Sequence, residues 1–346
     1  MYRGLAYQQN YNKNKIKRIK MSLGIPYMGS KRKIAKPLID YMLNSNPNAK
    51  YFYDLFGGGG AMSFEALQRK RFKKVFYNEF NEAIVNLLIK IKTDGVTSEF
   101  YEWIDRETFN KYKDGNCWKS GLVKTCWSFG NNQNGYLFGA NIEKYKRLLH
   151  EIIVNKSNSS RLEFEKLTGL FVDDYYLSKD DVQDRRIDIQ RLFTAQNNSF
   201  KEKISDYTNT RGGNVRSISQ QLQQLEQLAR LQQLLNIQSL KNIQSLEITN
   251  LSYEQVKIET PINETIIYCD PPYKGTRKYQ KDIDHYKFLE WVKNSPYKIY
   301  VSSYEFDLPC VFELSHRSSL SATNNSKKVV EKLFCNKVEL IKGTLF

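Results

Sequence analysis

The sequence predicts an α/β fold, in which helices cover both faces of a sheet, in a chain long enough for one large domain or for one domain with an insertion. Three apolar stretches carry this prediction. Residues 51–69 read as a strand, four glycines and a helix, and residues 74–80 read as a second strand that ends in an acid. A third strand, Ile266 to Cys269, stops at Asp270 and two prolines. Proline lacks a backbone donor and does not fit inside a sheet, so this strand must end there.

Asp270 therefore lies at the carboxyl edge of the sheet, where open α/β folds bind their ligands. The residue before a proline is held extended, so Asp270, Pro271, Pro272 and Tyr273 form a rigid hook. The Asp270 carboxylate and the Pro271 carbonyl are two acceptors that suit an exocyclic amine on a flat ring, whose lone pair they would aim at an electrophilic carbon. We expect Tyr273 to stack on a base that has left a duplex. A plain proline turn is the alternative.

Composition favours a polyanionic partner. The 346 residues include 53 Lys and Arg against 37 Asp and Glu, a net charge of +16. Nucleic acid is the first candidate, and a merely soluble basic protein is the alternative. The sequence has no long uncharged apolar run and no secretory leader, so we expect no membrane span. The five cysteines form no C-x-x-C pair and the three histidines complete no zinc pattern, which predicts no metal site, reduced thiols and a cytoplasmic location.

Residues 1–21 are rich in Tyr, Asn and Lys, and we expect a flexible basic arm able to touch phosphates. The alternative, which we prefer, is that Met21 is the natural start. A helix follows, with Ser30 as a plausible cap, Pro37 in the first turn and an end near Leu43.

The glycine run from Gly57 to Gly60 permits a tight turn and lets a ligand lie on the backbone at a helix N-terminus. Glu79 ends the next strand, 22 positions after Gly57, where an acid commonly grips the ribose of a nucleoside. No Gly-Lys-Ser/Thr follows the glycines, so a nucleoside cofactor with an uncharged tail fits better than a pyrophosphate. A purely structural turn is the alternative.

Three motifs occur in the order seen in Dam-type (class alpha) DNA adenine-N6 methyltransferases, which the chain resembles. They are Tyr27-x-Gly29-x-Lys31, Asp54-Leu55-Phe56-Gly57-Gly58-Gly59 with Asn78-Glu79-Phe80-Asn81, and Asp270-Pro271-Pro272-Tyr273. The resemblance covers roughly residues 22–112 and 246–340. It implies a Rossmann-like methyltransferase sheet with an inserted target-recognition domain, S-adenosylmethionine as cofactor and double-stranded DNA as partner.

The resemblance also implies roles for residues. The hook residues Asp270, Pro271, Pro272 and Tyr273 resemble the catalytic motif of the family. The implied cofactor-binding residues are Tyr27, Lys31, Asp54, Phe56, Gly57, Gly58, Gly59, Glu79, Phe80, Tyr253 and Asp270. Many relatives place an acid and an aromatic residue near the adenine of the cofactor, whereas Leu251-Ser252-Tyr253 keeps only the aromatic residue. A backbone group is the expected substitute for that acid.

These motifs divide the chain into a catalytic domain, residues 22–112 and 246–346, and a target-recognition insert, residues 113–215. Within the insert, Asn134-Gly135 between aromatic residues predicts a hairpin. Asn and Gln side chains can pair with adenine and cations can position phosphates, although an ordinary polar hairpin is the alternative. The expected DNA contacts are Lys119, Lys124, Asn131, Asn132, Gln133, Asn134, Tyr136, Arg211, Lys274 and Arg277.

Residues 216–245 form a Leu- and Gln-rich linker in which an apolar residue recurs every third position. Because a repeat of three does not match the period of an α-helix, the apolar residues would not stay on one face but would wind around the helix surface. We expect a helix to about Leu235 and a strand near Leu246–Thr249, and prefer tandem expansion of a linker to a partner-binding coil. Helices are further expected near 81–92, 98–112, 142–154 and 286–293, and strands at 298–304 and 338–341. Ser302, Ser303 and Tyr304 are candidates to line a base pocket, and a strand end with satisfied polar groups is the equal alternative.

Together these features predict a site-specific enzyme that transfers a methyl group from S-adenosylmethionine to adenine N6 in double-stranded DNA. The alternatives are an RNA adenine or DNA cytosine-N4 methyltransferase, a catalytically silent DNA-binding relative and a dinucleotide oxidoreductase. We expect a monomer, and leave open a cognate restriction nuclease as partner. The prediction requires Glu79 and Asp270 to lie at the same end of the sheet.

Overall fold

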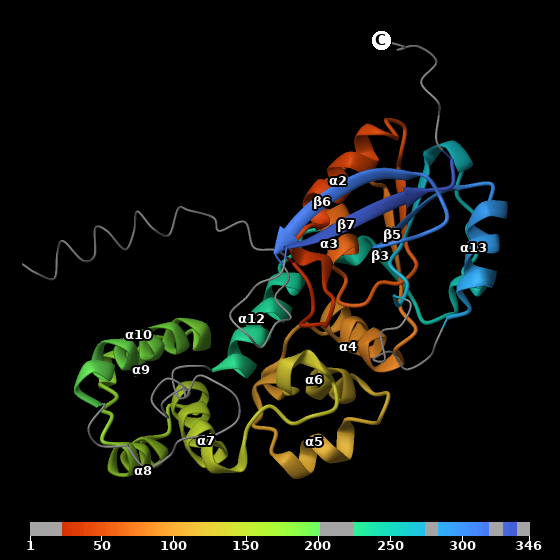
Figure 1. The fold of residues 1–346 in the computed structure, drawn as a ribbon. Helices are drawn as coiled ribbons and strands as arrows, with labels where there is room; N and C mark the ends of the chain where they lie inside the picture. Colours follow the sequence, from red (N-terminus) through yellow and green to blue (C-terminus); the bar gives the residue numbers. More distant parts are fainter. Residues whose placement is uncertain (1–22, 201–224, 274–282, 318–327, 338–346) are drawn as a thin grey trace, which may run out of the picture.

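The computed structural model describes residues 23–200, 225–273, 283–317 and 328–337. A seven-stranded sheet carries helices on both faces, and a helical lobe extends from one end of it (Figure 1). This arrangement confirms the predicted α/β class.

Five strands of the sheet are parallel, and two antiparallel strands complete one side in the order β3-β2-β1-β4-β5-β7-β6. The strands are β1 (Tyr51–Asp54), β2 (Lys74–Asn78), β3 (Leu246–Thr249), β4 (Thr265–Cys269), β5 (Lys298–Ser303), β6 (Cys310–Arg317) and β7 (Lys328–Cys335). The chain runs outward from β1 to β3 and then returns to the other side of β1 as β4. The carboxyl ends of β1 and β4 therefore flank a topological switch point, where such sheets bind ligands.

The described helices agree with most of the predicted ones. They are α2 (Ala35–Asn44), α3 (Ala61–Gln68), α4 (Glu82–Thr93), α5 (Arg106–Tyr112), α6 (Trp118–Cys126), α7 (Ala140–Asn155), α8 (Asn158–Thr168), α9 (Asp174–Leu177), α10 (Val182–Phe200), α12 (Glu226–Gln238) and α13 (His285–Asn294). The single helix predicted at 98–112 is wrong. A 3₁₀ turn, Ser98–Tyr101, comes first, and α5 starts anew because the Asp105 side chain caps it by accepting from the Thr108 N–H at 2.7 Å.

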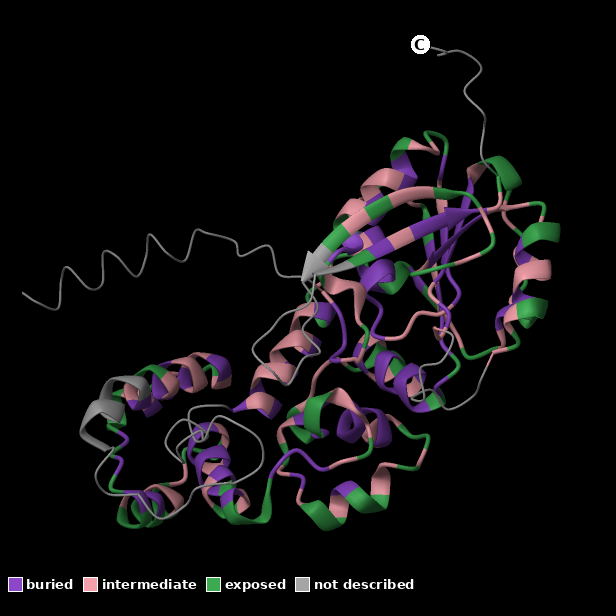
Figure 2. Ribbon diagram, in the orientation of Figure 1, coloured by how far each residue is buried: buried purple, intermediate pink, exposed green. Residues whose placement is uncertain are grey.

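Alternate residues of the central strands pack on opposite helical layers. Phe52 and Tyr268 face the apolar cluster that includes α2, α3 and α4. Tyr53 and Ile267 face the other cluster, which includes Phe288 of α13. The central strands β1, β4 and β5 are thus buried on both sides, so functional groups there must lie beyond the strand ends. In Figure 2 the edge strand β6 is instead coloured largely intermediate and exposed.

The end of the sheet that carries β6 and β7 was only partly anticipated. β6 was not predicted, and it pairs antiparallel with β7 at the edge. β7 also pairs antiparallel with β5, so it lies between β5 and β6. The strand expected at 338–341 lies outside the described residues.

The lobe is continuous with the catalytic domain through α6. A Cβ placed on Gly121 of α6 would lie 2.2 Å from the Ala83 carbonyl oxygen of α4, so only glycine lets the two helices approach this closely. Leu122 and Val123 share the apolar cluster that contains Leu87 of α4. The domain boundary expected at residue 113 therefore crosses a continuous core.

The predicted change from helix to strand in the period-three linker is confirmed, with α12 ending at Gln238 and β3 starting at Leu246. Leu228, Leu231, Leu234 and Ile237 are all buried. The apolar stripe winds around the surface of α12, and this suits a helix that has neighbours on several sides. Arg230 accordingly donates to the carbonyls of Thr125 and Cys126 at the end of α6 and of Ser128 just after it, and Arg32 donates to Gln233.

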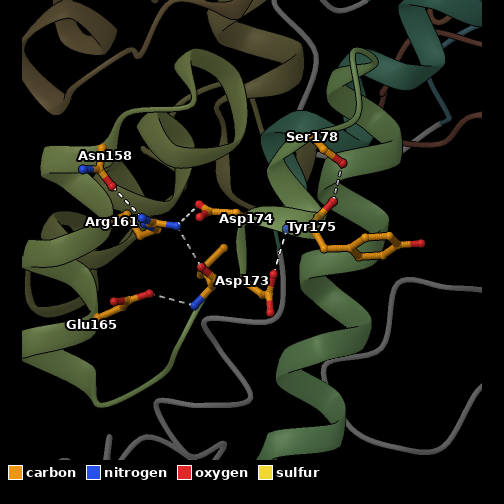
Figure 3. Close-up of polar contacts among 8 residues, drawn as sticks. Asn158, Arg161, Glu165, Asp173, Asp174, Tyr175 and Ser178 are labelled. Atoms are coloured by element: carbon orange, nitrogen blue, oxygen red, sulfur yellow. Dashed lines mark hydrogen bonds and ion pairs between the residues drawn. The ribbon is translucent and has the colours of Figure 1, made fainter. Parts of the chain in front are cut away.

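Polar contacts fix the outer corner of the lobe between α8 and α9 (Figure 3). The Arg161 guanidinium bonds Asn158 and Asp174, and Glu165 accepts from the Val172 N–H at 2.9 Å. Asp173 caps α9 by accepting from the Tyr175 N–H. These charged side chains pair with one another or with the backbone of the corner. The corner is therefore a structural feature of the lobe.

Candidate functional site

Three parallel strands bring three acids to one edge of the sheet. Asp54 ends β1 and lies in register with Tyr77 of β2 and Tyr268 of β4. Glu79 and Asp270 follow those two neighbouring strands, so they start roughly 10 Å apart, at twice the strand spacing. Burial raises the pKa of Asp54 to about 7, and the charges of Asp270 and Glu79 also contribute. The two acids therefore meet at one end of the sheet.

The glycine loop packs closely against a tyrosine of the next strand, β2. A Cβ on Gly57 would lie 2.2 Å from the ring of Tyr77, so no other residue fits there. The Tyr77 hydroxyl donates to the Gly58 carbonyl at 2.7 Å, and the Gly57 N–H donates to the Asn78 carbonyl at 2.8 Å. Gly58 and Gly60 have φ values of +48° and +74°. These contacts and φ values restrict the loop to one backbone conformation, which leads into the start of α3.

Glu79 closes that loop from the side. Its Oε2 accepts from the Gly58 N–H at 2.6 Å and its Oε1 accepts from the Asn81 N–H at 2.9 Å. Burial raises the pKa of Glu79, opposed by these backbone donors. Each carboxylate oxygen has two lone pairs, so the group can still accept from hydroxyls of a ligand.

Tyr27 lies against the same loop, as its motif predicts. Its ring would be 3.3 Å from a Cβ on Gly58, and the Ile25 N–H donates to the Gly59 carbonyl at 2.8 Å. The segment before α2 is therefore tied to the glycine loop along its backbone, and this places an aromatic ring at the loop.

Asn78 organises the strand ends, a role that its position in a motif did not reveal. Its Nδ2 donates to the carbonyls of Leu55 and Leu251, each at 3.0 Å. Its Oδ1 accepts from the Thr249 hydroxyl at 2.8 Å and from the Leu251 N–H at 3.0 Å. One buried amide thus joins the ends of β1, β2 and β3, and a polar residue closing an otherwise apolar strand was the available signal.

The aromatic residues assigned to the cofactor do not all lie alike. Phe56 and Tyr253 stack with centroids 5.6 Å apart, and both pack on Phe288 of α13. Phe80, in contrast, is 53% exposed. Phe56 and Tyr253 thus line the edge of the sheet on the α13 side, whereas Phe80 follows Glu79 with about half of its surface exposed.

Lys31 lies at the hook of Asp270 rather than beside Glu79. Its Nζ is 3.1 Å from Asp270 Oδ1, 3.3 Å from Glu331 Oε1 and 2.7 Å from the Tyr273 hydroxyl. Burial lowers the pKa of Lys31, but Asp270 and Glu331 more than offset this and leave it raised. Burial raises the pKa of Asp270 to about 6, opposed by Lys31. The carboxylate of the hook is therefore ionised at neutral pH.

Glu331, on β7, is a site residue that the sequence did not reveal. Its side chain is 3% exposed, and its Oε1 accepts from the Tyr273 hydroxyl at 2.5 Å and from the Ser302 hydroxyl at 2.6 Å. The only signal was a single acid within an apolar strand, Val329-Val330-Glu331. Ser302, expected in a base pocket, is buried against this carboxylate.

Tyr273 is anchored by its hydroxyl and packs its ring on Tyr304. The two ring centroids are 4.8 Å apart at 71°, and Tyr304 is 47% exposed. Burial raises the pKa of Tyr273, as do the charges of Asp270 and Glu331, so it is a neutral phenol. The hook thus ends in two aromatic rings, one anchored and one open.

The DNA-contact predictions need two corrections. Lys124 is 3% exposed, and its ammonium donates to the Gly115 carbonyl at 3.0 Å. Tyr136 is buried, and its hydroxyl donates to the Ile104 carbonyl at 2.8 Å. Both polar groups satisfy backbone acceptors inside the lobe, so neither faces a ligand. Lys119 keeps some exposure and pairs with Glu102 at 3.0 Å.

The predicted hairpin is reduced to a polar loop. One bridge joins Ser128 and Tyr136, and a 3₁₀ turn, Phe129–Asn131, replaces the first strand. The turn forms because Asn131 and Gln133 have positive φ and because Asn132 Oδ1 accepts from two backbone N–H groups, those of Asn134 and Gly135. Among the expected DNA contacts in this loop, Asn134 is exposed, and the half-buried ones are Asn131, Asn132 and Gln133.

This polar loop reaches the glycine-loop end of the site, because the Asn81 amide donates to Gln133 Oε1 at 3.2 Å. The other expected DNA contacts, Arg211, Lys274 and Arg277, lie outside the described residues. The described helices include none with the length and apolar character needed to cross a membrane.

Chemically, the edge holds two distinct kinds of acceptor. The Glu79 end offers a carboxylate and a glycine surface that suit the hydroxyls and backbone contacts of a nucleoside. The Asp270 end offers a carboxylate, a proline carbonyl and aromatic rings, which suit a flat ring with an amino group. The arrangement suits transfer of a group from the first ligand to the second.

Comparison with known families gives one match. The family model for the D12 class N6 adenine-specific DNA methyltransferase matches residues 27–116 and 142–300, which is more than half of the chain. The match includes the glycine loop, Glu79 and the hook, and it ends before β6 and β7. No curated protein sequence is similar enough to count as a relative.

Proposed function

The chain belongs to the D12 class N6 adenine-specific DNA methyltransferases, and from this premise we propose that it transfers the methyl group of S-adenosylmethionine to adenine N6 in double-stranded DNA. The observation that supports the proposal most directly is the placement of Glu79 and Asp270 on either side of Asp54, at one edge of the sheet. A donor and an acceptor bound at the two ends would meet above β1.

The residues of the β1–β2 end fit this cofactor. Buried Asp54 Oδ1 has no hydrogen-bond partner within the described part of the chain, while Ser63 donates to Oδ2 at 2.7 Å. A buried carboxylate oxygen of this kind suits a cationic ligand group such as the α-ammonium of the methionine moiety. Glu79 would accept from the ribose hydroxyls, and Gly57 to Gly59 would lie beneath the ligand. S-adenosylmethionine supplies an electrophilic methyl group on a sulfonium.

The Asp270 end would prepare the amine. The Asp270 carboxylate and the Pro271 carbonyl accept the two N–H groups of adenine, so that the nitrogen lone pair points at the methyl carbon. Tyr273 and Tyr304 flank the base, which must leave the duplex to reach them. Methylation would build positive charge on N6, which the ionised Asp270 would stabilise. The same carboxylate would accept the proton that N6 has to lose.

We propose the polar loop, residues 129–134, as a DNA-reading element. Asn134 is exposed, and amide side chains can pair bidentately with adenine in the major groove. The contact of Gln133 with Asn81 would place the reading element beside the cofactor end of the site. The net charge of +16 supports phosphate contacts around it.

The test is product analysis. Purified protein is incubated with tritium-labelled S-adenosylmethionine and unmethylated duplex DNA, and the digested nucleosides are separated. N6-methyladenosine in its deoxy form is the expected labelled product. Labelled N4-methylcytosine, labelling of RNA in preference to DNA, or tight DNA binding without labelling would each contradict the proposal.

Asp270→Ala is the matched loss-of-function variant. It removes the acceptor for the amine, and we expect methyl transfer to fall at least about a thousandfold. The control is Asp307→Ala, whose side chain is exposed and pairs with Lys293 at 2.8 Å on the surface. Circular dichroism should show both variants folded, and near-normal turnover by Asp270→Ala would remove the assignment.

A further inference from the structure

A buried carboxylate, which the family match does not reach, holds the polar end of the catalytic hook. Glu331 lies on β7, beyond residue 300, where the match ends. Its Oε1 is the common acceptor for Lys31 Nζ at 3.3 Å, Tyr273 at 2.5 Å and Ser302 at 2.6 Å. Three donors from three separate parts of the chain thus meet on one oxygen.

Lys31 is shared between two carboxylates because Glu331 is there. Its ammonium lies 3.1 Å from Asp270 Oδ1 and 3.3 Å from Glu331 Oε1, and its side chain is only 11% exposed. If Lys31 paired with Asp270 alone, its buried ammonium would occupy the acceptor oxygens of that carboxylate and compete for them with an incoming amine. With two carboxylates available, the lysine can move toward Glu331 when a substrate N–H approaches Asp270.

Glu331 also anchors Tyr273. Its hydroxyl donates to Glu331 and accepts from Lys31, so its ring angle is set by β7 rather than by the hook alone. Tyr304, which directly follows β5, packs on the ring, and the neighbour of β5 in the sheet is β7. Glu331 therefore controls both the charge beside Asp270 and the position of the ring beside the base.

From these contacts we propose that Glu331 is a positioning residue for methyl transfer, which draws Lys31 away from Asp270 and fixes Tyr273 so that the hook can accept the target amine. The inference rests on the function proposed above. Glu331 does not touch the reacting atoms, and it acts through Lys31 and Tyr273.

The test replaces Glu331 by glutamine, which keeps its size and its ability to accept from Tyr273 and Ser302 but loses its charge. With the charge gone, Lys31 pairs with Asp270 alone. We expect kcat to fall roughly ten- to a hundredfold. The dissociation constant for S-adenosylmethionine, measured by calorimetry, should stay unchanged, because Glu79 and the glycine loop are untouched.

The pH profile separates positioning from a merely structural role. The negative charge of Glu331 raises the pKa of Asp270, so Glu331→Gln should move the acid limb of kcat/KM to lower pH. The titratable groups that face Asp270 or this cluster are Lys31, Asp54, Tyr268, Cys269, Tyr273, Tyr304 and Glu331. All but Glu331 remain in the variant, so the shift reports the loss of one charge.

Two further variants complete the experiment. Glu331→Asp keeps the charge and should recover most of the rate, which also keeps the test decisive if Glu331→Gln folds poorly. Glu313→Gln on neighbouring β6 removes an exposed acid that pairs with Lys332 at 3.6 Å, and it should behave as wild type. If Glu331→Gln matches Glu313→Gln in kcat and pH profile, or if Glu331→Asp is no better than Glu331→Gln, the inference is wrong. Failure of the wild type itself to label adenine would instead overturn the proposed function.

Discussion

The ends of β2 and β4 each carry an acid, but the two acids are held in opposite ways. Glu79 accepts from the backbone N–H groups of Gly58 and Asn81, which the fold fixes in place. Asp270 is paired with the ammonium of Lys31, a long side chain that also pairs with Glu331. Backbone donors stay where they are as long as the fold persists, whereas a lysine can exchange one carboxylate for another.

The difference matches what each end would have to do. The end of β2 is preorganised, as suits a cofactor that binds the same way in every cycle. The end of β4 must accept an amine that arrives only after a base leaves its duplex, so its charges have to be balanced before and after that event. Asp54 lies between the two and is influenced by both acids.

The largest expected effect on cofactor affinity comes from breaking the preorganised end. In Gly57→Ala the new Cβ would lie 2.2 Å from the Tyr77 ring, whose hydroxyl is bonded to Gly58. Because the ring cannot move without losing that bond, the loop must shift, and we expect affinity for S-adenosylmethionine to fall about a hundredfold or more by calorimetry. Gly139→Ala is the control, since its φ is −70° and its nearest neighbour is the flexible Asn141 side chain. Equal affinities in the two variants would argue against a rigid loop.

A smaller effect should appear when the carboxylate of Asp270, at the end of β4, is titrated. The pKa of Asp270 is about 6, raised by burial and opposed by Lys31. Below that pH the carboxylate gains a proton and loses the negative charge that would hold the amine and stabilise its developing positive charge. The value of kcat/KM should therefore fall about tenfold per pH unit on the acid side and level off above pH 7. A profile that stays flat down to pH 5 would show that the charge of Asp270 is not needed.

The smallest effect concerns stability and the acid between the two ends. Burial raises the pKa of Asp54 to about 7, above its ordinary 3.8, so the folded state holds a proton that the unfolded state releases. Stability therefore falls as pH rises through this window, and the full penalty applies above about pH 7. Asp54→Asn cannot ionise, and should be more stable than wild type at pH 8, by on the order of 2 kcal/mol.

The advantage of Asp54→Asn should be largely lost near pH 4, where the folded wild type is protonated and the unfolded state, with its ordinary pKa of 3.8, is about half protonated. Thermal unfolding at pH 8 and at pH 4 measures the difference. The exposed Asp307→Asn serves as control and should change little at either pH. If Asp54 also meets a cationic group of the cofactor, the same variant should bind S-adenosylmethionine more weakly. A variant less stable than wild type at pH 8 would mean that the charge of Asp54 is satisfied inside the fold.

Local pattern was enough for much of the fold. The strand–glycine–helix order of residues 51–69, the hook at Asp270 and the period-three linker each predicted their elements, because strand ends, glycine turns and prolines are governed by short-range sterics. The helix predicted at 98–112 was wrong because a single side-chain cap, Asp105, outweighed a continuous pattern. Lys124 and Tyr136 were misassigned because exposure depends on what packs over a residue, and a polar side chain can satisfy a buried carbonyl.

The sequence alone determined which chemical groups stand at the strand ends, since Glu79 and Asp270 each follow an apolar strand that local rules terminate. Only the tertiary structure decided which partners those groups have. Asn78 joins three strands that are up to 173 positions apart, and Tyr273 meets Glu331 across 58 positions. Contacts over such separations arise from the strand order, and strand order is a property of the folded sheet rather than of any short stretch of chain.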